Sequence, residues 1–285
     1  MSRAAIRIFS KFAELLDVTW GSIADGQYLR RSGTNIIGAT GVGLGRNVLA
    51  GLTVSLGTDV VNDINIAVGE CRDDTNVVDI VLGTALTKQL DAAWAAGTNA
   101  GGRVDGVLAD GSWHCYVIMK ADRTTDFLFT NIFGNPTMPS GYVYKRRIAS
   151  IVRAGGSIRG FQQLGDYFQI LAPIDNHSGA TVAQNGTFLL VLSTSVPTGL
   201  KFFTDVSITC SHNTSNSISY IYDPDTTMPG RGPLYTPAAN VGNTMRAGMW
   251  TNTSGTLRVT AGTQTGTFTY IGSVNGYWDP RDKDR

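Results

Sequence analysis

The sequence predicts a mostly β protein, with a short N-terminal helix, a β-rich middle domain of jelly-roll or sandwich-like type that contains one helix, and a C-terminal β-sandwich domain. Short runs rich in Val, Ile, Thr, Tyr and Phe recur between turns rich in Gly, Asn, Pro and Ser, which is the rhythm of sandwiches and jelly rolls. Hydrophobic residues make up 42% of the 285 positions, enough to form a buried core. Charged residues make up only 16%, against roughly 25% in an average soluble domain.

The charge balance excludes two classes of partner. There are 23 basic and 22 acidic residues, for a net charge of +1, so no field of one sign attracts nucleic acid or an anionic membrane.

No apolar run approaches the ~20 residues of a membrane span. Arg3, Arg7 and Lys11 interrupt any signal-peptide run at the N-terminus, so we expect assembly in a reducing cytoplasm. The three scattered cysteines form no recognisable disulfide framework.

Residues 1–44 are predicted to hold an attachment or oligomerisation helix and a stalk-like linker. Apolar residues recur there at three- and four-residue steps, at Ile6, Phe9, Phe12, Ala13 and Leu16. A lone helix of about 15 residues is marginal in water. It therefore needs a surface to pack against. The candidates are the rest of the same chain, the same helix of sister chains, a binding site in a larger particle, and a membrane surface. Turn dipeptides then enclose a short strand at 27–30.

Residues 45–175 are predicted to form the middle domain. Strand-like runs cover 48–56, 63–68 and 77–82, and stronger apolar runs cover 113–121, 126–133, 145–154 and 166–174. Between them, residues 86–97 predict a helix, with Leu86, Leu90 and Trp94 on one face and Gly97 as its end. We expect the basic cluster Arg146, Arg147 and Arg153 at a solvated strand edge or in intersubunit ion pairs.

Residues 178–285 are predicted to form the C-terminal β-sandwich. Strands of five to eight residues alternate there with turns, and 223–237 form an exposed loop. We expect the charged tail over 279–285 to be solvated.

The sequence predicts no catalytic residue, metal site or cofactor. The paired carboxylates Asp73–Asp74, Asp122–Asp126 and Asp223–Asp225 lie in turn-like segments, where an Asp carboxylate normally accepts hydrogen bonds from backbone N–H groups. His114 and Cys115 are strand neighbours that point to opposite faces. Cys210 and His212 share a face, but no second ligand pair accompanies them. We therefore do not expect an enzyme.

One segment resembles a known family. Residues 86–168 are similar to a domain common in phage and prophage tail-fibre and other virion proteins. The motifs that carry the resemblance occur in order at Trp94, Trp113 with His114, Asp126, 136–142, 146–150 and 163–168. The resemblance implies a virion protein that is assembled in the host bacterial cytoplasm, forms a homotrimer and has no recognisable active site.

We therefore hypothesise a phage virion structural protein of tail-fibre type that attaches to the host surface as a homotrimer. Its N-terminus would contact other virion proteins, and residues 178–285 would form a tip that contacts a host glycan or protein. Aromatic side chains suit such contacts, and the candidates are Tyr220, Tyr222, Tyr235 and Trp250. One alternative is a purely architectural subunit, such as a head fibre, capsid decoration or baseplate connector. A second is a polysaccharide depolymerase, which needs two carboxylates ~5–9 Å apart.

Overall fold

The computed structural model describes residues 27–32, 35–40, 45–173, 175–214, 217–227, 233–263 and 265–283. Among these residues it contains strands and no helix, which confirms the prediction of a β chain with several sheets. The chain divides into two compact units, residues 1–45 and 46–285. The predicted helix over 1–17, with its apolar residues Ile6 to Leu16, lies outside the described residues. The predicted domain border near residue 176 falls inside the second unit and stays a prediction.

The described part of the first unit is a hairpin. Strands β1 (Gln27–Ser32) and β2 (Asn35–Thr40) pair antiparallel, from Gln27 opposite Thr40 to Ser32 opposite Asn35. The short strand predicted at 27–30 is therefore confirmed.

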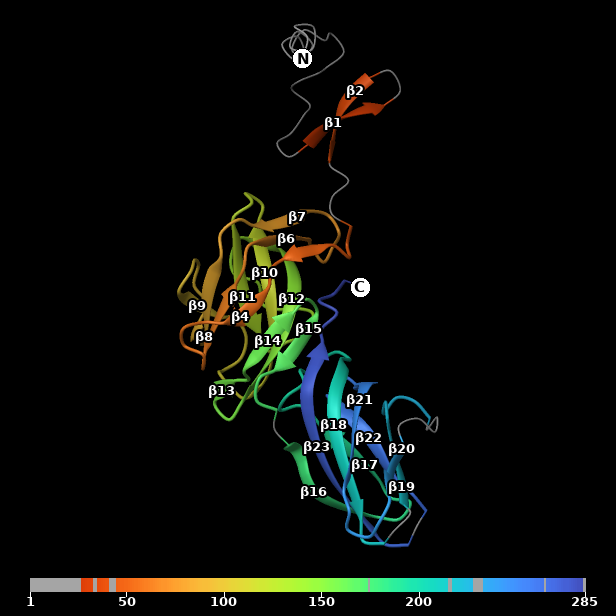
Figure 1. Ribbon diagram of the computed structural model, residues 1–285. Coiled ribbons are helices and arrows are strands. Elements are labelled where there is room, and N and C mark those ends of the chain that lie inside the picture. The colour runs from red at the N-terminus through yellow and green to blue at the C-terminus, as the bar shows by residue number, and fades with distance from the viewer. Residues whose placement is uncertain are drawn as a thin grey trace, which may run out of the picture. The chain divides into compact units, whose positions relative to one another are not determined.

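The second unit begins with an eight-stranded sheet (Figure 1). Its strand order is β13 (Ser157–Ile158), β12 (Tyr142–Ala154), β10 (Gly111–Lys120), β11 (Thr125–Thr130), β9 (Ala100–Arg103), β8 (Leu86–Ala93), β5 (Asp63–Ile66) and β4 (Val54–Leu56). Most neighbours pair antiparallel, but β9 is parallel to both β8 and β11. The apolar runs of β10, β11 and β12 are buried over most of their length, as expected of strands covered on both faces.

A three-stranded sheet of β3 (Leu49–Gly51), β6 (Gly69–Arg72) and β7 (Asp79–Leu82) lies beside it. The single strand predicted over 48–56 is thereby split between two sheets. Gly51 and Leu52 have φ angles of 65° and 50°, in the left-handed region that breaks a strand. A side chain at Gly51 would lie 2.3 Å from the Val68 carbonyl oxygen, so the break requires glycine there.

The rest of the unit is a sandwich of two sheets. The six-stranded sheet has the order β14 (Phe161–Leu164), β15 (Tyr167–Ile170), β23 (Thr267–Trp278), β18 (Phe203–His212) and β21 (Asn243–Trp250), and β16 (Asp175–Ala183) also pairs with β23. The four-stranded sheet has the order β17 (Thr187–Val191), β22 (Thr256–Ala261), β19 (Ser217–Tyr222) and β20 (Pro233–Thr236). The sheets meet at Tyr270, whose hydroxyl donates to Ser219 Oγ at 2.8 Å and whose ring lies 5.2 Å from that of Phe188.

The helix predicted over 86–97 is wrong. Residues 86–93 form strand β8, which pairs with β5 and β9. Its alternating burial places Lys88 and Leu90 inward, and Lys88 forms an ion pair of 2.8 Å with Asp126 of β11. Ala, Leu and Lys are good helix formers, but intrinsic helix propensities differ by less than about 1 kcal/mol per residue, so tertiary pairing overrides their preference.

The prediction of a solvated tail is also wrong for the residues that follow β23. Asp279 and Arg281 are 0% and 3% exposed, and Asp282 is 9% exposed. Arg147 of β12, fully buried, donates to Asp279 at 2.8 Å and to Asp282 at 2.9 and 3.0 Å. We call residues 279–282 the return segment, because they lead from the sandwich back to β12.

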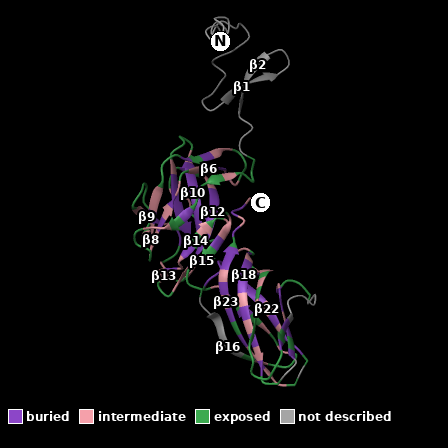
Figure 2. Ribbon diagram, viewed as in Figure 1, coloured by how far each residue is buried: buried purple, intermediate pink, exposed green. Residues whose placement is uncertain are grey.

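The return segment also corrects the interpretation of the basic cluster. Arg281 donates to the carbonyl oxygens of Ile148 and Leu52 at 2.7 and 2.8 Å. Arg146 donates in turn to the Arg281 carbonyl oxygen at 3.1 Å. Arg146 and Arg147 are thus held inside the chain rather than at a solvated edge, and only Arg153 keeps a partly exposed ion pair, with Asp110. Figure 2 shows how buried residues concentrate in β10, β12, β18 and β23.

Candidate functional site

The six-stranded sheet has one face in the core and one face toward solvent. Along β18, Thr204, Val206 and Ile208 are buried, whereas Phe203 and Ser207 are partly exposed. Because side chains alternate along a strand, Phe203 and every second residue after it point outward. The outward positions of β15, β21 and β23 follow from their register with β18.

Four aromatic residues meet on this outward face, one from each of four adjacent strands. Tyr167 lies opposite Trp278, Trp278 opposite Phe203, and Phe203 opposite Trp250. The ring centroids are 4.4, 5.3 and 5.4 Å apart in that order. Trp250 and Trp278 remain 47% and 40% exposed. We call this set the aromatic row.

Two glycines make room for the row. A Cβ atom at Gly248 would lie 2.5 Å from the Phe203 ring, and one at Gly276 would lie 2.4 Å from the Tyr167 hydroxyl. Both distances are too short for any real side chain, so the two rings lie over the glycine backbones. The rings thereby pack against glycines of neighbouring strands, a recognised stabilising arrangement in sheets. They lie close to the sheet instead of projecting away from it.

A polar row runs beside the aromatic row. It consists of Asp205, Arg246 and Asn275. Arg246 Nε donates to Asp205 Oδ1 at 2.8 Å, and Arg246 Nη2 forms a second bond to Oδ2. Asn275 donates to the same carboxylate at 3.3 Å, and the Tyr167 hydroxyl donates to it at 3.2 Å. Tyr167 therefore links the two rows.

The contacts of Asp205 fix its charge. The hydrogen bonds from Arg246 lower the pKa of Asp205, against the opposing effect of partial burial. Burial raises the pKa of Tyr167, and the neighbouring Asp205 carboxylate raises it further. At neutral pH the polar row therefore holds one carboxylate, one guanidinium and neutral donors, with its two charges paired. The two rows together offer ring faces and hydrogen-bonding groups to a ligand.

The predicted contact residues are divided between the two sheets. Trp250 belongs to the aromatic row. Tyr220 and Tyr222 lie in β19 and Tyr235 lies in β20, on the four-stranded sheet. Tyr222 is only 8% exposed, and its hydroxyl lies 2.9 Å from Thr260 Oγ1. Tyr235 is 44% exposed.

Tyr167, Phe203 and Trp278 are not among the contact residues predicted from the sequence. A local signal was present for the tryptophans, since Gly-Met-Trp at 248–250 and Gly-Tyr-Trp at 276–278 repeat the same pattern. In a strand this spacing places glycine and tryptophan on one face. Phe203 and Tyr167 carry no such signal, because their place depends on strand register.

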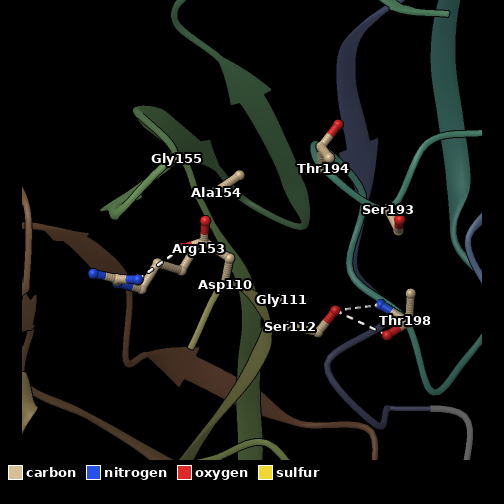
Figure 3. A pocket seen from close by; sticks show the side chains of 9 residues that line it. All are labelled: Asp110, Gly111, Ser112, Arg153, Ala154, Gly155, Ser193, Thr194 and Thr198. Atoms are coloured by element: carbon tan, nitrogen blue, oxygen red, sulfur yellow. Dashed lines mark hydrogen bonds and ion pairs between the residues drawn. The ribbon is translucent and has the colours of Figure 1, made fainter. Parts of the chain in front are cut away.

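A separate polar pocket of about 290 Å³ lies near the end of β12 (Figure 3). Ser112 Oγ accepts the Thr198 N–H at 2.8 Å, and Arg153 donates to Asp110 at 2.7 Å. Figure 3 shows the Arg153 guanidinium turned away from Ser193 and Thr194. Among the described residues that line this pocket, Asp110 alone has a carboxylate, whereas glycan hydrolysis normally uses two.

The carboxylate pairs considered from the sequence are engaged in turns or ion pairs. Asp73 accepts the N–H groups of Val77 and Val78 at 2.7 and 2.8 Å. Asp126 lies in a strand rather than the expected turn and pairs with buried Lys88. Asp122, Asp223 and Asp225 accept turn N–H groups or pair with Lys201.

His114, His212 and the three cysteines are buried in the core. His114 Nδ1 lies 2.8 Å from Ser150 Oγ, and burial lowers the pKa of His114 to about 3. Cys210 Sγ lies 3.7 Å from Ser219 Oγ. In the part of the chain that the structure describes, no three His, Cys, Asp or Glu side chains cluster as metal ligands. Nor does any helix there have the length and apolar character needed to span a membrane.

Comparisons with known proteins give little. No family model matches the chain, and no curated protein matches it. Among solved structures, the VP2 subviral particle of infectious bursal disease virus is 10% identical with a TM-score of 0.27, over 81% of this chain and 71% of that one. The viral particle of the same virus is 7% identical with a TM-score of 0.31, over 85% and 72%. Because scores this low do not establish a common fold, we infer function from the chain's own residues.

Proposed function

We propose that this chain is a phage virion protein of tail-fibre type that attaches the particle to the host surface through the aromatic row and the polar row. The observation that carries the proposal is the aromatic row itself, in which the exposed Trp250 and Trp278 lie on either side of Phe203 on one face of the six-stranded sheet. The all-β fold and the resemblance of residues 86–168 to virion domains support it.

The aromatic row is not needed to complete the core beneath it. The core at this level is formed by Phe202, Phe168 and Tyr277, which are 0–1% exposed and pack against one another. Large aromatic side chains left in a contiguous exposed set mark binding surfaces, and tryptophan and tyrosine are enriched among the residues that dominate binding energy.

The proposed assembly is a homotrimer that contacts other virion proteins through residues 1–44. Three copies of one weak site raise the overall affinity strongly when they engage together, without any new contact. A modest surface such as the aromatic row therefore suffices for firm attachment in a trimer.

The test is direct binding to cell-envelope material. Purified full-length chain is incubated with immobilised lipopolysaccharide, peptidoglycan and capsular polysaccharide preparations and with whole bacteria from a strain panel. We expect binding to at least one preparation, and loss of that binding in Trp250→Ala and in Trp278→Ala. Tyr235→Ala is the matched control, because Tyr235 is similarly exposed but lies on the other sheet. Binding that survives both tryptophan changes, or no binding to any preparation, would overturn the proposal.

The architectural alternative has one observation in its favour. The outer face of the four-stranded sheet exposes Leu189, Val191 and Ile218 by 46%, 47% and 40%, which suits contact with another protein. An architectural subunit predicts that the tryptophan variants leave envelope binding unaffected and that serine substitutions at Leu189, Val191 and Ile218 disturb assembly. Light scattering of each variant, compared with the 30.4 kDa chain mass, separates the two functions.

A further inference from the structure

The proposed site has a direction, because the aromatic row crosses the strands rather than following one of them. Neighbouring strands lie about 4.8 Å apart, so the four residues span roughly 14 Å. Trp250 and Trp278 are separated by the single strand β18, which places them roughly 9.6 Å apart. That separation is close to the length of a disaccharide in an extended chain. A ligand that contacts both tryptophans therefore lies across the strands.

The polar row lies to one side of the aromatic row along the strands. Asp205 is two residues from Phe203 on β18, which is a displacement of about 7 Å. Arg246 is four residues from Trp250 on β21, and its guanidinium is bonded to the Asp205 carboxylate. Sugar rings have an apolar C–H face and hydroxyl groups around their edge. A sugar whose C–H face packs on the aromatic row has its edge hydroxyls directed toward Asp205 and Arg246. The two rows are thus complementary to both parts of one sugar ring.

The donors and acceptors of the polar row are available to such hydroxyls. Asp205 accepts two hydrogen bonds from Arg246, whereas a guanidinium carries five N–H donors. The Arg246 side chain is 67% exposed. Arg246 therefore retains donors on its solvent side while its position is fixed by the carboxylate.

The charge on this face favours an uncharged ligand. Arg246 and Asp205 neutralise each other through two hydrogen bonds, so an anionic sugar would have to compete with the Asp205 carboxylate. The neighbouring outward positions among the described residues of β18, β21 and β23 carry hydroxyls or an aliphatic chain, at Ser207, Thr209, Ser211, Thr244, Thr269, Ile271 and Ser273. A nucleic acid or an acidic peptide finds no field of one sign here.

The aromatic row is also preorganised. The Phe203 ring contacts both tryptophan rings, and Trp278 contacts Tyr167 as well. The glycines beneath hold the Phe203 and Tyr167 rings close to the sheet. Little side-chain freedom is left to lose on binding, which favours a rigid, ring-shaped ligand.

We propose that the aromatic row and the polar row bind an unbranched, uncharged glycan segment of about three sugar units, which lies across strands β15, β23, β18 and β21. This inference rests on the proposed attachment function and names the ligand class of the same site. A branch on the sugar edge that faces the polar row would replace a hydroxyl within reach of Arg246, so unbranched chains fit best.

The test uses a microarray of linear and branched, neutral and anionic oligosaccharides, probed with the full-length chain. We expect binding to neutral linear chains of about three units or more. Titration of the best binder should change the tryptophan fluorescence. Trp250→Ala and Trp278→Ala should each weaken binding at least about tenfold, equivalent to about 1.4 kcal/mol, and Tyr235→Ala should leave it unchanged. Binding of anionic or branched glycans alone, or of no glycan, overturns the inference.

A second measurement separates this inference from the attachment function. Envelope preparations that bind the chain are treated either with periodate, which cleaves the vicinal diols of sugars, or with a protease. Loss of binding after periodate supports the glycan ligand. Binding that survives periodate, is lost after protease and still depends on Trp250 overturns the glycan inference, while the attachment function stands.

Discussion

Replacing Arg147 by methionine removes the cation from the network that joins β12 to the return segment. Arg147 is fully buried and forms ion pairs of 2.8 Å with Asp279 and 2.9 Å with Asp282, and it donates to Ser150 Oγ at 2.9 Å. Burial by itself would lower the pKa of Arg147, but the two carboxylates raise it above its ordinary value. The guanidinium is therefore charged at every pH at which the fold exists.

The expected loss follows from the carboxylates left behind. Methionine fills much of the volume of the arginine stem, so the cavity contribution is small. Asp279 and Asp282 would lose a buried partner, and breaking a buried pair by removing one member costs about 3–5 kcal/mol. In urea denaturation we expect a midpoint lower by more than about 1 M with an unchanged slope.

The control is Lys201→Met. Lys201 pairs with Asp225 at 2.6 Å, but the side chains are 44% and 48% exposed, and exposed pairs contribute about 0–1 kcal/mol. Adding Asp279→Asn and Asp282→Asn to Arg147→Met should restore part of the lost stability, because no carboxylate is then buried alone. Equal midpoints for the Arg147 and Lys201 variants would refute the reasoning.

Three further outcomes are expected. Gly276→Val should displace the Tyr167 ring, because a Cβ there lies 2.4 Å from its hydroxyl, and should weaken envelope binding; unchanged binding contradicts this. The buried thiols should resist a thiol reagent at pH 8 until urea unfolds the chain, since burial raises the pKa of Cys71 to about 12; rapid reaction of the native protein contradicts this. Asp205 has a lowered pKa, so its stabilisation is present above about pH 4 and lost below it. The stability difference between wild type and Asp205→Asn should shrink in acid urea titrations, and a constant difference would count against the ion pair.

Much of the β structure could be predicted from local patterns. The apolar runs that became β10, β11 and β12 are long, rich in β-branched and aromatic residues and bounded by turn residues. The helix prediction for residues 86–97 was wrong because their leucines and alanines fit a helical period as well as the alternation of a strand. Its inward residue Lys88 is stabilised by Asp126, 38 positions away in the sequence.

The candidate site was harder to predict because it depends on strand register. Trp250 could be selected from the sequence as an aromatic residue in a polar segment. Its neighbours Phe203 and Trp278, however, are placed beside it by the register of three strands. Likewise, the charges of the return segment favour solvent unless carboxylates and arginines meet in the interior. Arg147, the partner of Asp279, lies 132 positions earlier in the sequence, and no local sequence pattern encodes this contact.

The long separation between β12 and the return segment has a consequence for folding. β12 is made first, and its arginines lack their buried partners until residues 279–282 arrive. These partners are the Arg281 carbonyl oxygen for Arg146 and the Asp279 and Asp282 carboxylates for Arg147. Burying an unpaired guanidinium is energetically costly, so Arg146 and Arg147 keep this otherwise apolar strand solvated during that interval. A chain with both arginines changed to methionine should therefore scatter more light as it refolds from urea, and equal scattering would argue against this role. The same two charges that anchor the finished core thus act earlier as protection against aggregation, at the stage when exposed strands of neighbouring chains can pair.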